Sequence, residues 1–343
     1  MDRVVDLAER GVFPDAIVRL AIRALVRTRL REERAKDRRS VAGAEHDLVA
    51  ALRKSPVALV PDLANRQHYE VPAAFFENVL GRRLKYSGSL FAPGVRDLDA
   101  AEEAMLALTA ERACLDAGQE ILDLGCGWGS LTLWMAERFP TSRITAVSNS
   151  ASQRAFIEEK AKRAGIGNVR VLTADINDFE PDASFDRVVT VEMLEHVRNH
   201  ELLFSRIASW LRPRGRLFVH VFAHRHHGYP FEDAGRGDWM ARNFFTGGLM
   251  PSEALLLHFQ RDLVLEERWR VSGLHYEKTA NAWLARLDAH REAAKTALAS
   301  VYGKKDAARW LGRWRLFFMA CAEMFGFHAG DEWGIAHYRF VRR

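Results

Sequence analysis

The chain has 343 residues, 48% of them hydrophobic and 28% charged, so it can bury a full core as one large domain or two smaller ones. Its net charge of +5 lies mostly at the amino terminus, where residues 1–55 contain 13 Lys or Arg against 9 Asp or Glu. Because the remainder is nearly neutral, this distribution argues against a nucleic-acid-binding protein with a broad basic face.

Three widely separated cysteines, Cys114, Cys126 and Cys321, form no C-x-x-C pair. They indicate neither a disulfide framework nor a metal site. No apolar run approaches the roughly 18–20 residues that span a bilayer, and the amino terminus lacks the apolar segment of a signal peptide. We expect a cytoplasmic protein without a bound metal.

Residues 1–64 are expected to form a helical amino-terminal extension. Within it, residues 14–39 have the pattern of an amphipathic helix. The arginines of this helix recur every four residues: Arg19, Arg23, Arg27 and Arg31. A solvated basic face is the simpler interpretation, and contact with an anionic membrane surface or an acidic partner is the alternative. Residues 40–65 are predicted to be a linker.

From about residue 115 the chain alternates apolar segments typical of strands with helical segments. The predicted strands are 120–124, 143–148, 169–173, 185–191 and 215–222. This alternation predicts an α/β fold with a doubly wound parallel sheet over residues 115–224, which binds ligands at the carboxyl ends of its strands. Residues 225–343 are rich in Trp, Phe and His and are expected to form a helical cap, with carboxyl-terminal strands completing the sheet.

The first predicted strand runs directly into a glycine-rich turn. Gly125, Gly127 and Gly129 stand at alternate positions, where they permit positive φ and a close approach of backbone to a ligand. The spacing is G-x-G-x-G and differs from the G-x-G-x-x-G of dinucleotide-binding folds. The turn therefore indicates a nucleotide-like ligand without identifying it.

The next two strands end in groups suited to a nucleoside. Asn149 and Gln153 follow the second strand, where dinucleotide sites usually carry an acidic residue, and their amides can bond ribose hydroxyls. Asp175, after the third strand, can accept from an exocyclic amine, with Ile176 against the base. With the glycine turn, these strand ends resemble those of class I S-adenosylmethionine-dependent methyltransferases, which have a Rossmann-like fold.

The fourth strand ends in a cluster of two carboxylates and one imidazole: Glu192, Glu195 and His196. An imidazole with an ordinary pKa near 6.5 can accept a proton near neutral pH, as attack by a neutral amine requires. A neighbouring carboxylate can orient that imidazole or hold a cationic amine. Metal binding is the weaker interpretation because no matching ligand set stands elsewhere.

Further segments resemble the cyclopropane-fatty-acyl-phospholipid synthase superfamily, including residues 68–72 and Leu84-Lys85-Tyr86-Ser87. Within it, residues 192–196, 231–233, 244–252 and 317–327 are most similar to coclaurine N-methyltransferases. The likeness covers roughly residues 65–340, with 65–114 as a lid over cofactor and substrate. It implies that Glu192, Glu195 and His196 match the acid/base residues of N-methyltransferases. It also implies that S-adenosylmethionine is contacted by Tyr86, Ser87, Gly125, Gly127, Asn149, Gln153, Asp175 and Ile176.

The lipid synthases of the superfamily provide the alternative interpretation. The resemblance implies that they hold a bicarbonate ion, and Glu195, His220 and Tyr276 could fill three of its places here. The cysteine of that site is Gly88 in this chain, and the synthases usually carry Gly where this chain has Glu192. Both departures favour an amine substrate over an alkene.

We therefore expect methyl transfer to an amine of a hydrophobic or aromatic small molecule, with lipid acyl-chain modification as the alternative. Aromatic faces in the cap would attract a cationic amine. The residues expected to line the substrate pocket are His220, Phe222, Trp239, Phe244, Tyr276 and Trp333. A membrane contact through the basic helix 14–39 and a homodimer are left open, and no nucleic acid is expected.

Overall fold

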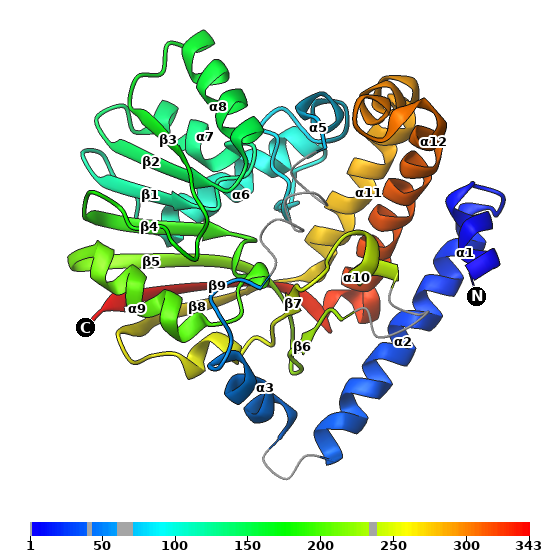
Figure 1. Cartoon of the computed structure of the whole chain (residues 1–343), viewed down its shortest axis with the longest axis horizontal. Coiled ribbons are helices and arrows are strands. Elements are labelled where there is room, and N and C mark those ends of the chain that lie inside the picture. The colour runs from blue at the N-terminus through cyan, green and yellow to red at the C-terminus, as the bar shows by residue number, and fades with distance from the viewer. Residues whose placement is uncertain (1, 40–42, 60–70, 233–238) are drawn as a thin grey trace.

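The computed structural model describes residues 2–39, 43–59, 71–232 and 239–343 (Figure 1). At its centre is a seven-stranded sheet with the order β3-β2-β1-β4-β5-β9-β8. Four parallel strands have the predicted bounds: β1 (Glu120–Leu124), β2 (Arg143–Ser148), β3 (Val169–Thr173) and β4 (Phe185–Val191). The fifth, β5 (Leu211–His224), extends beyond the predicted 215–222 at both ends. The expected doubly wound fold is confirmed.

Helices cover both faces of the sheet (Figure 1). On one face, apolar side chains of α7 (Ser130–Arg138) pack with Ile121 and Val189, and on the other those of α9 (His200–Trp210) pack with Leu122 and Val188. This alternation follows from the two-residue period of strands that are buried on both faces. The same layers include α6 (Leu98–Arg112) and α8 (Ala151–Arg163).

Two antiparallel strands complete the sheet beyond β5. β9 (Trp333–Arg342) lies between β5 and β8 (Leu263–Val271) and pairs antiparallel to both. Residues 225–343 were expected to form a helical cap with carboxyl-terminal strands that complete the sheet; β9 and β8 are such strands, and β8 lies well before the carboxyl terminus, at Leu263–Val271. The exposed charged side chains of this edge strand, Glu266 to Arg268, hide its apolar pattern in the sequence.

The cap stands over the carboxyl ends of the parallel strands (Figure 1). It is formed by the long helices α11 (Gly273–Ala289) and α12 (Arg291–Phe325), which pack against each other and against α5 (Ala73–Val79). Their contact is an aromatic core that contains the fully buried Trp283 and Trp314. Shorter elements join cap and sheet: η2 (Leu194–His196), β6 (Tyr229–Pro230), α10 (Trp239–Asn243), β7 (Leu249–Met250), η3 (Leu255–His258) and η4 (Phe327–Gly330).

The amino-terminal extension contains α1 (Asp2–Glu9), α2 (Asp15–Arg39) and α3 (Ala44–Leu52). The predicted helix 14–39 is confirmed as α2. The predicted linker 40–65 is wrong in part, because α3 buries Val49 and Leu52; a nine-residue helix with two buried residues leaves a weak periodic signal. The predicted motif residues 68–70 and 233 lie outside the described residues.

The basic face of α2 is partly used within the molecule. Arg19 Nη1 lies 2.9 Å from Glu323 Oε1 on α12, and Arg23 pairs with the same carboxylate. Arg27 and Arg31 are exposed. In the part of the chain that the structure describes, no helix is both long and apolar enough to cross a membrane.

Candidate active site

The glycine turn after β1 has the backbone that its spacing predicts. The φ angles are +85° at Gly125, +53° at Gly127 and +79° at Gly129. A Cβ at Gly125 would lie 2.6 Å from Cγ of Met193, so this glycine is required by close packing as well as by φ. The amide of Gly125 donates to the Val147 carbonyl of β2 at 3.0 Å, which fixes the turn at the sheet edge.

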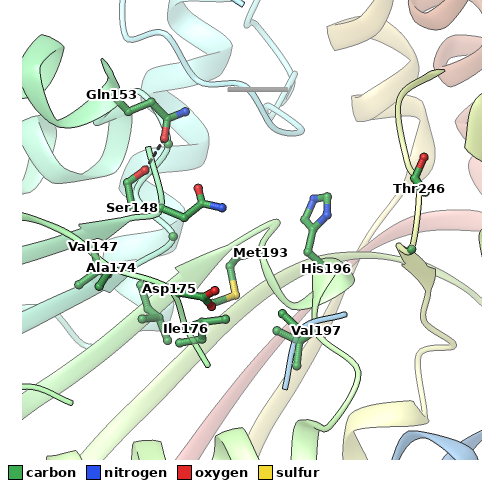
Figure 2. A pocket seen from close by; sticks show the side chains of 16 residues that line it. Val147, Ser148, Gln153, Ala174, Asp175, Ile176, Met193, His196, Val197 and Thr246 are labelled. Atoms are coloured by element: carbon green, nitrogen blue, oxygen red, sulfur yellow. Dashed lines mark hydrogen bonds between the residues drawn. The ribbon is translucent and has the colours of Figure 1, made fainter. Parts of the chain in front are cut away.

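A pocket lies at this edge of the sheet and brings together the residues that are predicted to bind the nucleoside (Figure 2). It is lined by Gly125, Gly127, Asn149, Gln153, Asp175 and Ile176, among others. Gln153 Oε1 accepts from Ser148 Oγ at 2.6 Å, whereas its buried Nε2 has no hydrogen-bond partner among the described residues. A buried amide donor without a protein partner fits a polar ligand at this position.

A second, larger pocket adjoins the first and shares Gly125, Gly127, Gln153 and His196 with it. Tyr86 and Ser87 line this second pocket and are not part of the first pocket's lining. The structure therefore places them beside the residues that are expected to bind the nucleoside. The shared residues make the two pockets one continuous site.

Glu192 lines the second pocket. It has a left-handed backbone, with φ of +48°, and its amide donates to the His220 carbonyl of β5 at 2.8 Å. Its Oε1 accepts from the Gly88 amide at 2.9 Å and lies 3.3 Å from His220 Nε2. Its Oε2 accepts from the Tyr276 hydroxyl at 2.7 Å. Donors from three separate elements therefore fix this carboxylate.

Burial and the charges around Glu192 determine which of the two carboxyls, Glu192 or Glu195, binds a proton more readily. Burial raises the pKa of Glu192, while the ammonium of Lys85 and the donated hydrogen bonds oppose that rise. Burial and the neighbouring charge of Glu192 raise the pKa of Glu195 well above its usual range. Glu195 Oε1 accepts from the Phe222 amide at 2.9 Å, but its Oε2 has no partner among the described residues. Of the two carboxyls, Glu195 is therefore the better holder of a proton, and it does not line either pocket.

His196 lines both pockets and stands opposite Gln153 across the first (Figure 2). Its ring centroid lies 4.7 Å from that of Phe245. Burial lowers the pKa of His196 to about 4, although the charge of Glu192 opposes this. The ordinary pKa expected from the sequence is therefore wrong, and the imidazole is neutral at physiological pH.

The predicted substrate-pocket residues fall into two groups. Phe222 and Tyr276 line the second pocket, and His220 lies behind Glu192. The other three line neither pocket: Trp239 donates to Glu9, Phe244 stacks on Phe317 at 4.4 Å, and Trp333 donates to Tyr229.

Sequence reasoning missed several wall residues. Among these are Phe231, Met240 and Met324, which line the second pocket. Their apolar character was visible in the sequence, but nothing there separated pocket wall from core. Lys85, adjacent to the predicted Tyr86 and Ser87, also lines the second pocket, and burial lowers its pKa to about 8.

The sheet, the glycine turn and the amide- and carboxylate-lined pocket together define a class I S-adenosylmethionine-dependent methyltransferase. Residues 61–333 match the family model described as mycolic acid cyclopropane synthetase. The chain belongs to this family, and the resemblance seen in the sequence is confirmed.

The chain is similar to individual relatives of two kinds, N-methyltransferases and lipid synthases. An (S)-coclaurine N-methyltransferase of Thalictrum flavum subsp. glaucum is 36% identical over 339 residues, covering 98% of this chain and 94% of its own. A crystal structure of coclaurine N-methyltransferase bound to N-methylheliamine and SAH has a TM-score of 0.92 and 34% identity, covering 98% of each chain. The cyclopropane-fatty-acyl-phospholipid synthase of Escherichia coli (strain K12) is 27% identical, covering 81% of this chain and 68% of its own.

S-adenosylmethionine is the cofactor, and the residues present fit it. The unpartnered amide of Gln153, the carboxylate of Asp175 and the open backbone at Gly127 supply donors, an acceptor and space for a nucleoside. When bound, this group supplies an electrophilic methyl. The chain's own residues must then hold and orient the acceptor.

Proposed function

We propose that this enzyme transfers the methyl group of S-adenosylmethionine to an amine of a hydrophobic or aromatic small molecule. One observation carries the proposal: the Glu192 carboxylate is held by Gly88, His220 and Tyr276 in a pocket whose lining includes many aromatic and methionine side chains. A buried carboxylate inside aromatic walls favours a cation with an apolar body.

The carboxylate and the imidazole have different tasks in this proposal. Glu192 attracts the ammonium form of the substrate and takes the proton that must leave before the nitrogen can attack. The neutral His196 accepts a hydrogen bond from the amine and orients its lone pair. Orientation of two bound reactants lowers such barriers by roughly 7–11 kcal/mol in favourable cases. Glu195, which holds a proton more readily, accepts a hydrogen bond from the Phe222 amide and has no direct role in the transfer.

The alternative of lipid acyl-chain modification is weakened by the same contacts. The resemblance to the synthases would assign His220 and Tyr276 to a bicarbonate ion, but here both contact the Glu192 carboxylate instead. A Cβ at Gly88, where the synthases carry cysteine, would lie 2.4 Å from Cδ1 of Ile335. Because both side chains already have the Glu192 carboxylate as a partner, these contacts support an amine over an alkene as the methyl acceptor.

Labelled S-adenosylmethionine tests the proposal directly. The enzyme is incubated with coclaurine, with heliamine, with a panel of primary and secondary aromatic amines, and separately with unsaturated phospholipid vesicles. We expect label in at least one amine product, identified by mass, and none in lipid. Label recovered as cyclopropane in lipid, with none in any amine, would overturn it.

A further inference from the structure

Behind the active site, two histidines face each other across the β5–β9 pair. His220 and His337 are register partners, both fully buried, with ring centroids 4.7 Å apart. His337 Nε2 lies 3.0 Å from His220 Nδ1. A direct imidazole–imidazole contact inside a sheet needs one ring to donate and the other to accept.

Both ends of this pair have a further partner. His220 Nε2 lies 3.3 Å from Glu192 Oε1 in the pocket. His337 Nδ1 lies 2.8 Å from Nη1 of Arg112, the last residue of α6, which is half-buried. The guanidinium of Arg112 also lies 4.9 Å from the ring centroid of Trp269. A chain of four groups thus connects the pocket to the end of α6, along the face of the sheet that α6 covers.

The direction of every bond in the chain follows from Arg112. A guanidinium can only donate, so His337 Nδ1 must accept, and the proton of the neutral ring lies on Nε2. His337 Nε2 then donates to His220 Nδ1, which places the His220 proton on its own Nε2. That N–H is directed at Glu192, so the chain ends in a hydrogen bond donated to the carboxylate.

The surroundings keep both rings neutral. Burial and the nearby cations Arg112 and Lys85 lower the pKa of His220 and of His337 well below the usual value. Other groups also face the Glu192 carboxylate: Lys85, Tyr276 from α11, Glu195 and His196 from η2, and Cys321 from α12. Because a guanidinium does not give up its proton, the chain cannot pass a proton to solvent, and it fixes tautomers instead.

We propose that Arg112 is a positioning residue that acts through His337 and His220, fixing their tautomers so that Glu192 stays an ionised hydrogen-bond acceptor for the amine. One part of this inference, that Glu192 receives the proton of the substrate, rests on the proposed function. The fixed tautomers follow from the donor chain alone and can be measured without any substrate.

The direct test is the tautomer of each ring in the whole enzyme. Two-bond proton–nitrogen spectra of ¹⁵N-histidine-labelled protein distinguish Nε2–H from Nδ1–H, and His220→Asn and His337→Asn spectra identify the signals. We expect Nε2–H on both rings in the wild type and in Arg112→Lys, which retains a donor. In Arg112→Met, where Nδ1 of His337 loses its donor, we expect a shift toward Nδ1–H.

Kinetics give the second readout, with any amine that the wild type methylates. Arg112→Met should lower kcat/KM by about tenfold to a hundredfold, the worth of one hydrogen bond to a charged group. The acid limb of its pH profile should move to higher pH, because the carboxylate is less stabilised as an anion. Arg112→Lys should retain most of the wild-type kcat/KM and most of the wild-type position of the acid limb. The affinity for S-adenosylhomocysteine should be unchanged in all variants.

Arg339→Met is the matched control. The Arg339 guanidinium lies 5.3 Å from the centroid of the same Trp269 ring and donates to Glu266, Glu267 and the Arg112 carbonyl, and none of its partners among the described residues is an imidazole. Its loss should leave the tautomers and the acid limb unchanged. Unchanged tautomers in Arg112→Met, or an equal acid-limb shift in Arg339→Met, would overturn the proposal. A wild type that methylates no amine would count against the proposed function, while the spectra still decide the role of Arg112.

Discussion

At the scale of single residues, Glu192 combines a backbone cost with hydrogen bonds that offset it. A left-handed φ at a non-glycine residue costs on the order of 1–3 kcal/mol. Each hydrogen bond to the carboxylate contributes about 1.5–3 kcal/mol when the group is charged. Glycine would adopt this φ of +48° freely but would leave the Tyr276 hydroxyl without its acceptor. The strained turn is therefore explained by the carboxylate that it places in the pocket.

Replacing Glu192 or Glu195 by glutamine distinguishes the roles of the two carboxyl groups. Glu192→Gln removes the anion that receives the amine proton, so we expect kcat/KM to fall by about 10²–10⁴, typical of losing an acid/base group. Glu195→Gln replaces a carboxyl that already favours its neutral form, so its loss should be much smaller. Steady-state kinetics and calorimetric binding of S-adenosylhomocysteine measure both. Equal losses in the two variants would contradict this division.

His196→Ala tests the imidazole. Since burial lowers the pKa of His196 to about 4, its ring is neutral throughout the working range and contributes orientation. We expect a severe loss of kcat with little change in cofactor affinity. Because His196 does not titrate near pH 6.5, any inflection of the wild-type kcat profile near that pH should remain in the variant. A large loss of S-adenosylhomocysteine binding would instead assign His196 to the cofactor.

At the scale of elements, the sequence was most informative where a signal is local. The ends of β1 to β4 were predictable because apolar runs there stop at glycine or polar residues, and the cofactor pocket follows from those ends. The charged edge strand β8 and the short helix α3 lacked such signals. The chain from Arg112 to Glu192 could not be predicted, because His220 and His337 meet only through the antiparallel register of β5 and β9.

The contact between α1 and α12 also depends on tertiary structure, and it carries a prediction. Glu9 is 3% exposed, accepts from Trp239 Nε1 at 2.9 Å and from Arg309 Nε at 2.6 Å, and lies 3.1 Å from Arg313 Nε. It thus ties the extension to both α10 and α12. Glu9→Gln removes the anion that these two arginines share, and of the two Arg309 keeps Asp6 as a charged partner. Because both arginines are partly exposed, we expect a loss of about 1–3 kcal/mol of stability.

Met240, the residue after Trp239 in α10, lines the second pocket, so the Glu9→Gln variant should also have a raised KM for the amine. Urea unfolding and steady-state kinetics measure the two effects. Asp6→Asn is the control, because Asp6 pairs with Arg309 from a more exposed position. If Asp6→Asn destabilised the enzyme as strongly as Glu9→Gln, the buried position of Glu9 would not be the cause.

At the scale of the whole molecule, the site is assembled from segments far apart in the chain, and burial of titratable groups accompanies that assembly. Gly88, Glu192, His220 and Tyr276 meet only when the segment between α5 and α6, the sheet and α11 are packed together. Such groups couple folding to pH, because their protonation differs between folded and unfolded chains.

His200, beside the active site, makes this coupling measurable in isolation. Its Nε2 lies 3.1 Å from the Leu194 carbonyl, its Nδ1 is buried without a partner among the described residues, and burial lowers its pKa to about 4. Between pH 6.5 and about 4 the unfolded chain therefore binds more protons at this residue than the folded chain. Its contribution to stability is complete above pH 6.5 and is lost as the pH falls toward 4.

We expect the difference in free energy of unfolding between wild type and His200→Gln to shrink on acidification. The limiting slope is about 1.4 kcal/mol per pH unit for one group. Urea titrations at pH 7.5, 6.5, 5.5 and 5.0 give the difference at each pH, so that other titrating groups cancel. His290→Gln, at an exposed position, controls for the loss of an imidazole as such. A difference that stays constant over this range would show that His200 protonates as readily in the folded enzyme as in the unfolded chain.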